Sequence, residues 1–219
     1  MIAQMRHHLS VKARRKDRTM WEERYAGSRD YVFGTAPAQF LRDHLDRLIP
    51  GQTALAVADG EGRNSVFMAE RGMEVTALEF APTAISRAKD LAAERSVTVD
   101  FRQCDILRDP WPDAHFDVVA GIFIQFVGPD ERALQFERMQ AATKPGGIVM
   151  LHGYTPKQLE HGTGGPPFVE NLYTPEMLRS AFSGWEIETL DAYEREVQEG
   201  RGHSGMSALI DLIARKPIE

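Results

Sequence analysis

Residues 53–65 read TALAVADGEGRNS, and this stretch decides the predicted fold. Its first six residues form a short apolar run that is typical of a buried strand, and Gly60 and Gly62 follow at the strand end. A helix is predicted over 63–71, ending at Gly72. Strand-end glycines let a ligand approach the backbone, and the helix N-terminus offers unpaired N–H groups to an anionic group. A tight turn without a ligand is the alternative for this motif alone.

The alternation of apolar runs and helix-period segments continues on both sides of this stretch. Proline and glycine mark the boundaries, as in the KPGG sequence at 144–147 that ends one helical segment. The strands are predicted over 74–79, 97–102, 116–123 and 148–154, and the helices over 36–49, from Pro82 onward and over 129–142. This βαβ rhythm indicates a parallel sheet with helices on both faces.

The rhythm changes after residue 154. A short helix is predicted from Thr174, which is a plausible N-cap. Residues 184–193 alternate in part between apolar and charged, as an edge strand does, whereas 205–214 is almost wholly apolar, as a strand covered on both faces is. The segment 194–204 suits a hairpin between them. The predicted fold class is therefore α/β: a Rossmann-like seven-stranded sheet, mostly parallel, with an antiparallel last strand.

Composition and charge limit the possible classes of protein. With 219 residues, the chain is expected to form one domain over 20–219, preceded by a basic and flexible extension over 1–19. Six bases and Asp17 give that extension a charge of +5, so a net charge of -6 leaves -11 for the rest. Because an acidic body repels phosphate backbones, we expect no nucleic-acid partner.

Other features concern the compartment and metals. No apolar run approaches the roughly 18 residues that cross a bilayer, and the first 19 residues lack the apolar stretch of a signal peptide, which predicts no membrane partner and a cytoplasmic location. Cys104 is the single cysteine, so an internal disulfide and a cysteine-rich zinc site are excluded. We expect no metal site.

Acidic residues end two of the predicted strands. Glu79 ends the second strand, 17 residues after Gly62, where a carboxylate can accept hydrogen bonds from ribose hydroxyls. Asp105 ends the third strand in the same way. Since the carboxyl ends of parallel strands line one crevice, both carboxylates are expected to face one ligand. The order Gly60-x-Gly62-x-x-Ser65 is close to a dinucleotide fingerprint, with serine in place of the third glycine.

These features together resemble the class I S-adenosylmethionine-dependent methyltransferases. The resemblance rests on the acidic ends of strands two and three, the KPGG turn and the closing antiparallel hairpin. More narrowly, four motifs resemble the tellurite-resistance and thiopurine-methyltransferase-like branch: MWEERY at 20–25, YVFG at 31–34, GEGRN at 60–64 and GTGGP at 162–166. The resemblance runs from Met20 to Lys216.

The resemblance implies S-adenosylmethionine as cofactor. It places the methionine end on the turn 58–62, the ribose on Glu79, the adenine on Asp105 and the backbone of Ile106, and the sulfonium above 121–125. The residues it implies in cofactor binding are Tyr25, Gly34, Ala58, Asp59, Gly60, Gly62, Asn64, Glu79, Phe80, Asp105, Ile106, Ile122 and Gln125.

The chain departs from the family pattern at two positions. Ala58 stands where the first glycine is usual, and Ala56 stands where an acidic residue is usual. Alanine is the smallest side chain that could replace that glycine, so the turn can survive. Asp59 or a group from the N-terminal segment would have to replace the missing carboxylate.

Methyl transfer is an in-line displacement that needs positioning rather than a metal or a covalent intermediate. The predicted catalytic residues are His203, as a base or a substrate-orienting group, and Gln125 and Tyr154 at strand ends facing the crevice. A solvent-exposed hairpin position is the alternative for His203. The glycine-rich loop 162–167 is either a substrate cover or a crossover loop.

An aromatic lid over the cofactor is predicted near the N-terminus, with packing against the domain as the alternative. Its members are Trp21, Tyr25, Tyr31 and Phe33. The predicted acceptor is a small molecule, and the family resemblance implies a soft sulfur, selenium or tellurium nucleophile. Two other functions fit the sequence: a nicotinamide-dependent oxidoreductase, and a module that binds S-adenosylmethionine without catalysis. The sequence does not define the oligomeric state.

Overall fold

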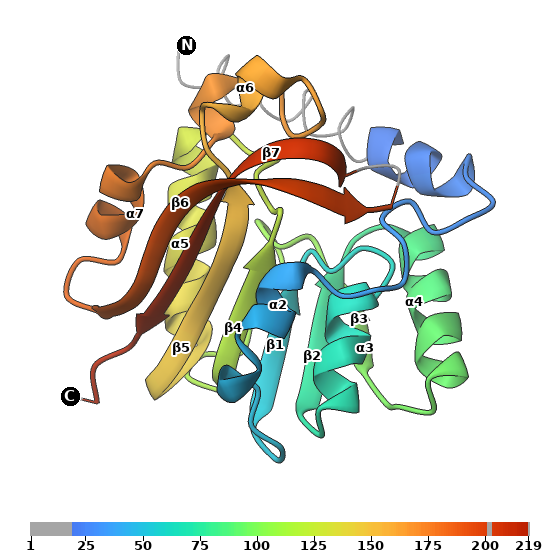
Figure 1. Ribbon diagram of the computed structural model, residues 1–219. Helices are drawn as coiled ribbons and strands as arrows, with labels where there is room; N and C mark the ends of the chain where they lie inside the picture. Colours follow the sequence, from blue (N-terminus) through green and yellow to red (C-terminus); the bar gives the residue numbers. More distant parts are fainter. Residues whose placement is uncertain (1–18, 201–202, 219) are drawn as a thin grey trace, which may run out of the picture.

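The computed structural model describes residues 19–200 and 203–218, and the basic extension predicted over 1–19 lies outside this part except for Thr19. Seven strands form one sheet in the order β3-β2-β1-β4-β5-β7-β6 (Figure 1). They are β1 (Thr53–Val57), β2 (Glu74–Glu79), β3 (Asp100–Gln103), β4 (Phe116–Ile122), β5 (Thr143–Tyr154), β6 (Glu186–Glu199) and β7 (His203–Arg215). Neighbouring strands from β3 to β5 are parallel, and β7 is antiparallel to both β5 and β6. The predicted fold class is confirmed.

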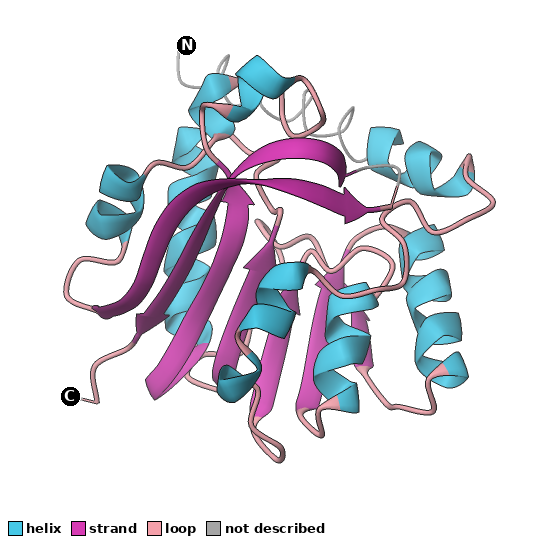
Figure 2. Cartoon of the chain, in the orientation of Figure 1, coloured by secondary structure: helices cyan, strands magenta, loops and turns pink. Residues whose placement is uncertain are grey.

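Helices cover both faces of the sheet (Figure 2). The helices are α2 (Gln39–Asp43), α3 (Arg63–Glu70), α4 (Pro82–Glu94), α5 (Pro129–Ala142), α6 (Gln158–His161) and α7 (Pro175–Ala181), with short 3₁₀ turns η1 (Leu45–Arg47) and η2 (Val169–Asn171). Residues 19–26 are also helical. Phe40 of α2 and Met68 of α3 pack on one face, and Phe136 of α5 and Phe182 beside α7 pack on the other. Burial of these apolar residues on both faces fixes the layers.

Three predicted boundaries near the sheet are wrong. The helix predicted over 36–49 is broken into α2 and η1. The third strand was predicted from residue 97 but begins at Asp100. Ser96 adopts a left-handed φ of 57°, and the Val97 N–H donates to the Ala92 carbonyl, so the chain is still in the turn after α4 at these residues. The predicted turn at 144–147 lies inside β5 as a bulge, since Phe116 pairs with Thr143 but Val118 pairs with Ile148.

The last two strands are longer than the sequence pattern predicts. Their pairing extends to Glu199 opposite His203, so most of the segment 194–204, predicted as a hairpin loop, is strand. The charged residues of this stretch lie on β6, an edge strand with a solvated face, and such a strand does not need an apolar pattern. Both strands arch over the carboxyl ends of the parallel strands in Figure 1. The predicted order, with the apolar strand inside and the polar strand at the edge, is correct.

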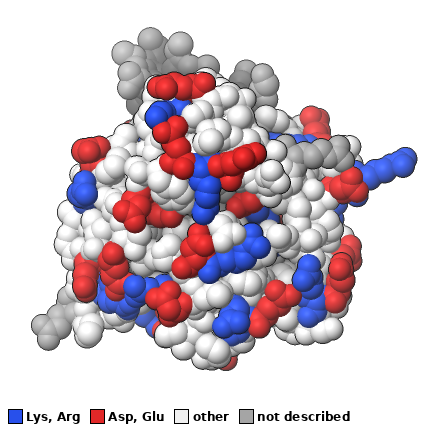
Figure 3. Space-filling view, in the orientation of Figure 1, with Lys and Arg blue, Asp and Glu red and all other residues white. Residues whose placement is uncertain are grey.

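Other sequence predictions concern the helix after residue 174 and the surface. The helix α7 is capped as predicted, because the Thr174 hydroxyl accepts a hydrogen bond from the Met177 N–H at 3.2 Å. On the face shown in Figure 3, acidic and basic side chains are interspersed. Within the described ranges, no helix has the length and apolar character needed to cross a membrane.

Gly62 supports the packing of α3 against α4 and provides a test of the fold. Its φ is 89°, and a Cβ there would lie 2.7 Å from the Ala88 Cβ and 2.9 Å from the Ala88 Cα. We expect Gly62→Ala to lower the free energy of unfolding by about 1–3 kcal/mol more than left-handed strain alone. Gly51→Ala is the matched control, because Gly51 has a φ of 81° with no atom within 4 Å of an added Cβ. Chemical denaturation measures both, and equal losses would contradict this packing role.

Candidate active site

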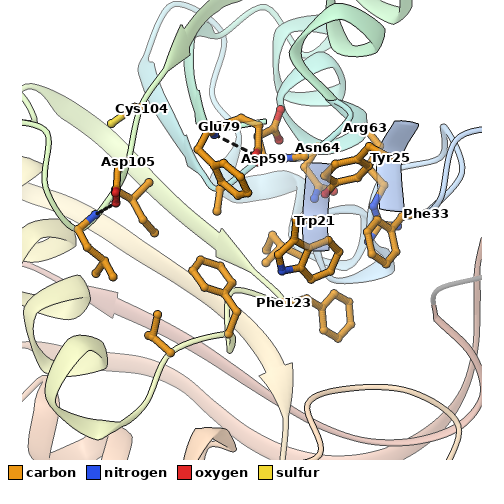
Figure 4. A pocket seen from close by; sticks show the side chains of 18 of the residues that line it. Trp21, Tyr25, Phe33, Asp59, Arg63, Asn64, Glu79, Cys104, Asp105 and Phe123 are labelled. Atoms are coloured by element: carbon orange, nitrogen blue, oxygen red, sulfur yellow. Dashed lines mark hydrogen bonds between the residues drawn. The ribbon is translucent and has the colours of Figure 1, made fainter. Parts of the chain in front are cut away.

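A pocket lies where β1, β2, β3 and β4 end and β7 begins (Figure 4). It holds about 1130 Å³ of space free of protein atoms, a volume that includes open solvent at its mouth. Its lining is Trp21, Tyr25, Phe33, Ala58, Asp59, Gly60, Arg63, Asn64, Glu79, Phe80, Cys104, Asp105, Ile106, Leu107, Ile122, Phe123, Phe126, Val127, Glu131 and His203. Ten of the thirteen residues predicted to bind the cofactor are among these.

The Glu79 carboxylate lies at the centre of the pocket edge. It accepts three backbone hydrogen bonds, from Gly60, Phe80 and Ala81, each 2.9 Å long. Burial raises the pKa of this carboxyl to about 7, although the three N–H groups lower it. One N–H reaches Oε2 and two reach Oε1, so Oε2 can accept one further hydrogen bond. This free position can accept a ligand hydroxyl.

Asp59 lies beside Glu79, in the turn between β1 and the helix α3. Its carboxylate accepts hydrogen bonds from the Ser65 backbone N–H, at 3.2 Å, and from the Ser65 hydroxyl. Burial raises its pKa to about 6. Ser65 stands where a dinucleotide fingerprint has its third glycine. Its hydroxyl holds the Asp59 carboxylate in the turn, which gives this position a reason to be serine.

Ala58 keeps the backbone conformation of the glycine that is usual in the motif. Its φ is 49°, a left-handed value that is uncommon for residues with a Cβ. The turn therefore survives the replacement by alanine, as expected from the size of the side chain. Ala56, by contrast, is buried within β1 and does not line the pocket.

Two predicted ligand-binding glycines, Gly34 and Gly62, do not line the pocket. Gly62 faces α4, where only a residue without a side chain fits against Ala88. Gly34 has a φ of 71° and lies near Gly200, which follows β6. Close packing therefore requires glycine at position 62, whereas at Gly34 an added Cβ would lie 3.7 Å from the nearest atom and only the positive φ favours glycine.

Gln125 and Tyr154 also lie outside the pocket lining, which corrects the prediction that both face the crevice. The Gln125 amide donates to the carbonyls of Tyr154, at 2.8 Å, and Asn171, at 3.4 Å, and its oxygen accepts from the Tyr154 N–H at 2.6 Å. Its hydrogen-bonding groups therefore bind the backbone. The Tyr154 hydroxyl is buried and has no partner among the described residues. The left-handed turn at Phe123, with φ of 56°, redirects the chain after β4 and places Phe123 in the pocket instead.

Aromatic side chains form one wall of the pocket. Trp21 packs against Tyr25 and Phe33, with ring centroids 5.8 and 6.1 Å apart. Three of the four predicted lid residues therefore lie in the pocket. The fourth, Tyr31, donates from its hydroxyl to the Arg87 carbonyl at 3.1 Å, so it packs on α4 instead.

Buried polar groups anchor the segment that carries these rings. The Glu61 carboxylate accepts the Val32 N–H at 2.6 Å and pairs with Arg87 at 2.6 Å. Asn64 accepts the Ala38 N–H at 2.9 Å. The motif after β1 thus shapes two sides of the pocket, its own turn and the aromatic wall.

His203 begins β7 and is buried in the pocket wall rather than exposed in a hairpin loop. Its ring lies 4.6 Å from that of Phe33 and 4.0 Å from that of Phe123, centroid to centroid. Burial lowers the pKa of the imidazole well below its usual range, and Arg63, His152 and Arg24 lower it further. The neutral form is therefore favoured.

Arg63 is a pocket residue that the sequence analysis missed. It is the first residue of α3, and its Nη1 pairs with Glu199 of β6 at 2.8 Å. Its position directly after the glycine turn was a usable signal, because side chains at a helix start face the crevice. Its partner was not predictable, since Glu199 was expected in a loop. The other pocket residues that were missed are Cys104, Leu107, Phe126, Val127 and Glu131, whereas Phe123 lies within the segment 121–125 predicted next to the sulfonium.

The glycine-rich loop 162–167 does not line the pocket. Thr163 donates to the carbonyl of Met206 and occupies the space beside Gly205, where an added Cβ would lie 2.7 Å away. Gly165 lies against the ring of Tyr154. The loop therefore packs on β5 and β7, as expected of a crossover loop.

Comparison with known sequences identifies the type of domain. Residues 54–147 match the family model described as a methyltransferase domain. A demethylmenaquinone methyltransferase from Renibacterium salmoninarum is 32% identical over 133 residues, which are 60% of this chain and 51% of the relative. A malonyl-[acyl-carrier protein] O-methyltransferase from Serratia marcescens is 32% identical over 58% of this chain and 49% of the relative. The chain thus spans about half the length of the curated relatives it matches.

Comparison with solved structures gives the same fold. A structure described for the conversion of a disulfide bond into a thioacetal group in echinomycin biosynthesis has a TM-score of 0.72, 20% identity and 92% coverage of both chains. TehB from Haemophilus influenzae has a TM-score of 0.68 and 17% identity over 83% of this chain and 63% of that one. The [4+2]-cyclase SpnF, at 21% identity and 92% and 93% coverage, has a TM-score of 0.63. The match to a methyltransferase domain covers residues 54–147, and the solved structures share the fold of the chain at 21% identity or less. Because one of these structures is described as a [4+2]-cyclase, the fold does not fix one reaction.

Ala58→Gly tests whether the turn after β1 is held in a left-handed conformation. Relief of the left-handed strain outweighs the entropy cost of glycine, so we expect the free energy of unfolding to stay unchanged or rise by up to about 1 kcal/mol. Ala56→Gly, in the extended part of the same strand, is expected to lower it by about 1–2 kcal/mol. Urea denaturation compares the two variants, and a comparable loss in both would contradict the assigned conformation.

Proposed function

We propose that this protein is an S-adenosylmethionine-dependent methyltransferase that acts on a small molecule. The observation that carries the proposal is the meeting of Glu79, Asp105 and the Gly60 turn in one pocket. Parallel strands bring these residues together from positions far apart in the sequence, and the same edge of the sheet binds nucleotides in related α/β folds. The match of residues 54–147 to a methyltransferase domain supports the same function.

The residues at the pocket edge fit an adenosyl group. Glu79 has one unused acceptor position for a ribose hydroxyl. Asp105 and Ile106 follow β3 and are proposed to hold the adenine, with Phe80 and Ile122 as apolar neighbours in the lining. The turn from Ala58 to Gly60, with Asn64, is proposed for the methionine end.

When bound, S-adenosylmethionine would supply an electrophilic methyl group on a sulfonium. The protein's part is to position an acceptor and exclude water, for which it has Trp21, Phe33 and Phe123 in the pocket wall. Holding two reactants about 3–3.5 Å apart can contribute roughly 7–11 kcal/mol. His203, which lies against Phe33 and Phe123, is the proposed acceptor-side residue. Gln125 and Tyr154 are not proposed to touch the reactants.

The proposed acceptor atom is a soft nucleophile such as sulfur, selenium or tellurium. Support comes from the motifs at 20–25, 31–34 and 60–64, which resemble the tellurite-resistance and thiopurine-methyltransferase-like branch. The described part of the chain matches TehB in fold over 83% of the chain, which agrees with this branch without identifying the acceptor.

Binding of S-adenosylhomocysteine tests the cofactor assignment. We expect it to bind in isothermal titration calorimetry, and we expect Glu79→Ala to weaken binding by about tenfold or more, because a charge-assisted hydrogen bond contributes about 1.5–3 kcal/mol. Glu74→Ala is the matched control, since Glu74 is the exposed first residue of the same strand. Its affinity is expected to equal that of the wild type.

Two controls make the outcome decisive. Because Glu79 also holds the turn, Asp105→Ala serves as a second variant if Glu79→Ala does not unfold cooperatively. Unchanged affinity in folded variants at both positions would refute the adenosyl assignment. Stabilisation by NAD instead of S-adenosylhomocysteine in a thermal-shift titration would favour the oxidoreductase. Binding without transfer to thiols, selenite, tellurite or thiopurines would favour the non-catalytic module.

A further inference from the structure

The two ring nitrogens of His203 have different surroundings. The side chain is 8% exposed and lines the pocket. Its Nδ1 is enclosed by protein and has no hydrogen-bond partner among the described residues. Nε2 is not among the enclosed, unpartnered atoms of the described residues, and it is the other ring nitrogen of a side chain that lines the pocket.

This asymmetry determines where a neutral imidazole carries its proton. A proton on Nδ1 would bury an unpaired N–H donor, whereas a proton on Nε2 leaves only an unpaired lone pair at Nδ1. Buried donors without partners are rarer and costlier than under-used acceptors. The favoured tautomer therefore has its N–H on Nε2, directed at the ligand space.

The charged groups around His203 favour an anion in that space. Arg63 of α3, Arg24 of the helical residues 19–26 and His152 of β5 all lower its pKa, after burial as the largest cause. Glu199 of β6, opposite His203 in the strand pairing, is paired with Arg63. Tyr154 of β5 packs edge-on against the imidazole. Glu199 is matched by Arg63, and the His152 ring is bonded to Asp211. The Arg24 guanidinium, 5.2 Å from the centroid of the Phe33 ring, is therefore the cation beside this part of the pocket, while the carboxylates of Asp59, Glu79, Asp105 and Glu131 also belong to the pocket lining.

We propose that His203 acts as a neutral hydrogen-bond donor, through Nε2–H, to an acceptor that binds as an anion. This inference rests on the proposed function, and it replaces the alternative of His203 as a general base. A donor cannot remove a proton at the same atom, so His203 does not deprotonate the acceptor, which fits an acceptor that enters already ionised. Thiolates and the oxyanions of selenium or tellurium share this chemistry.

The transfer step then needs no proton movement. For a thiolate, a sulfur lone pair forms the new bond to the methyl carbon. The bond between that carbon and the sulfonium sulfur breaks, and its electron pair stays on the cofactor sulfur. The products are a neutral thioether and S-adenosylhomocysteine. His203 would orient the thiolate through Nε2–H until methyl transfer removes the negative charge of the sulfur.

Nitrogen-15 NMR of histidine-labelled protein tests the tautomer without requiring a substrate. The chain has seven histidines, so the signals of His203 are assigned by their loss in His203→Gln. We expect a neutral ring protonated at Nε2 at pH 7 that stays neutral at pH 5.5. A ring protonated at Nδ1, or a doubly protonated ring at pH 7, would overturn the donor role.

Activity of variants separates a donor from a base. Glutamine supplies an N–H donor but no base, and phenylalanine supplies neither. With S-adenosylmethionine and 4-nitrothiophenolate as probe, we expect His203→Gln to retain turnover within about tenfold of wild type and His203→Phe to lose at least a further tenfold. Equal losses in both variants would overturn the donor role, because the probe is already ionised and a restored N–H donor should restore turnover. His161→Gln is the control, because His161 pairs with Glu194 away from the pocket lining.

Probe binding tests the charge of the acceptor and its source. In the presence of S-adenosylhomocysteine, we expect 4-nitrothiophenolate to bind at least tenfold more tightly than 4-nitrothioanisole, its neutral methylated form. Selenite competing with the thiolate would indicate an inorganic acceptor, and its failure to compete an organic one. Equal binding of the charged and neutral probes, or no binding of either anion, would overturn the anionic acceptor. Failure of S-adenosylhomocysteine to bind would refute the proposed function separately, since the NMR result does not depend on it.

Discussion

Residue 79 links the ends of three strands, and the geometry of the pocket depends on this linkage. Its carboxylate accepts the N–H of Gly60 after β1 and those of Phe80 and Ala81 after β2. Its backbone carbonyl accepts the N–H of Cys104 after β3 at 2.9 Å. A buried carboxylate is costly without such partners, so the three N–H groups and the acid stabilise one arrangement together. The pocket is thus pre-formed along the sheet edge.

The remaining walls are attached to the same turn. Asn64 and Glu61 bind backbone N–H groups of the N-terminal segment, and Arg63 pairs with Glu199 near the end of β6. Glu199 also accepts the Gln39 N–H at 3.0 Å, which joins the arching strands to the start of α2. Segments from both ends of the chain therefore meet over the adenosyl side of the pocket. This arrangement places aromatic rings and His203 opposite the strand ends.

The sequence predicts the parts of this structure that follow a local pattern. Apolar runs and glycine turns locate β1 and β2 to within a residue, and the acidic residues after β2 and β3 lead to the pocket residues Glu79 and Asp105. The position of the last strand inside the sheet was predictable because its sequence is almost wholly apolar. The survival of the turn at Ala58 was also expected, from the small side chain at a glycine position.

Side-chain directions at the irregular strand ends were not predictable. Extending β4 as a regular strand would aim Gln125 at the crevice, but the left-handed Phe123 changes the direction of the chain. Tyr154 ends β5, and its backbone N–H and carbonyl both bond to the Gln125 side chain, a contact that the pattern within residues 148–154 does not contain. The pairing of Arg63 with Glu199 joins residues far apart in the sequence and has no local signature.

A crystal structure of the protein with S-adenosylhomocysteine tests the central claim most directly. The account predicts the ribose hydroxyls within hydrogen-bond distance of the Glu79 carboxylate, the adenine beside Asp105 and Ile106, and the sulfur directed toward the wall that contains Phe123 and His203. A ligand seated elsewhere, or an adenosyl group that makes no contact with Glu79, would contradict it.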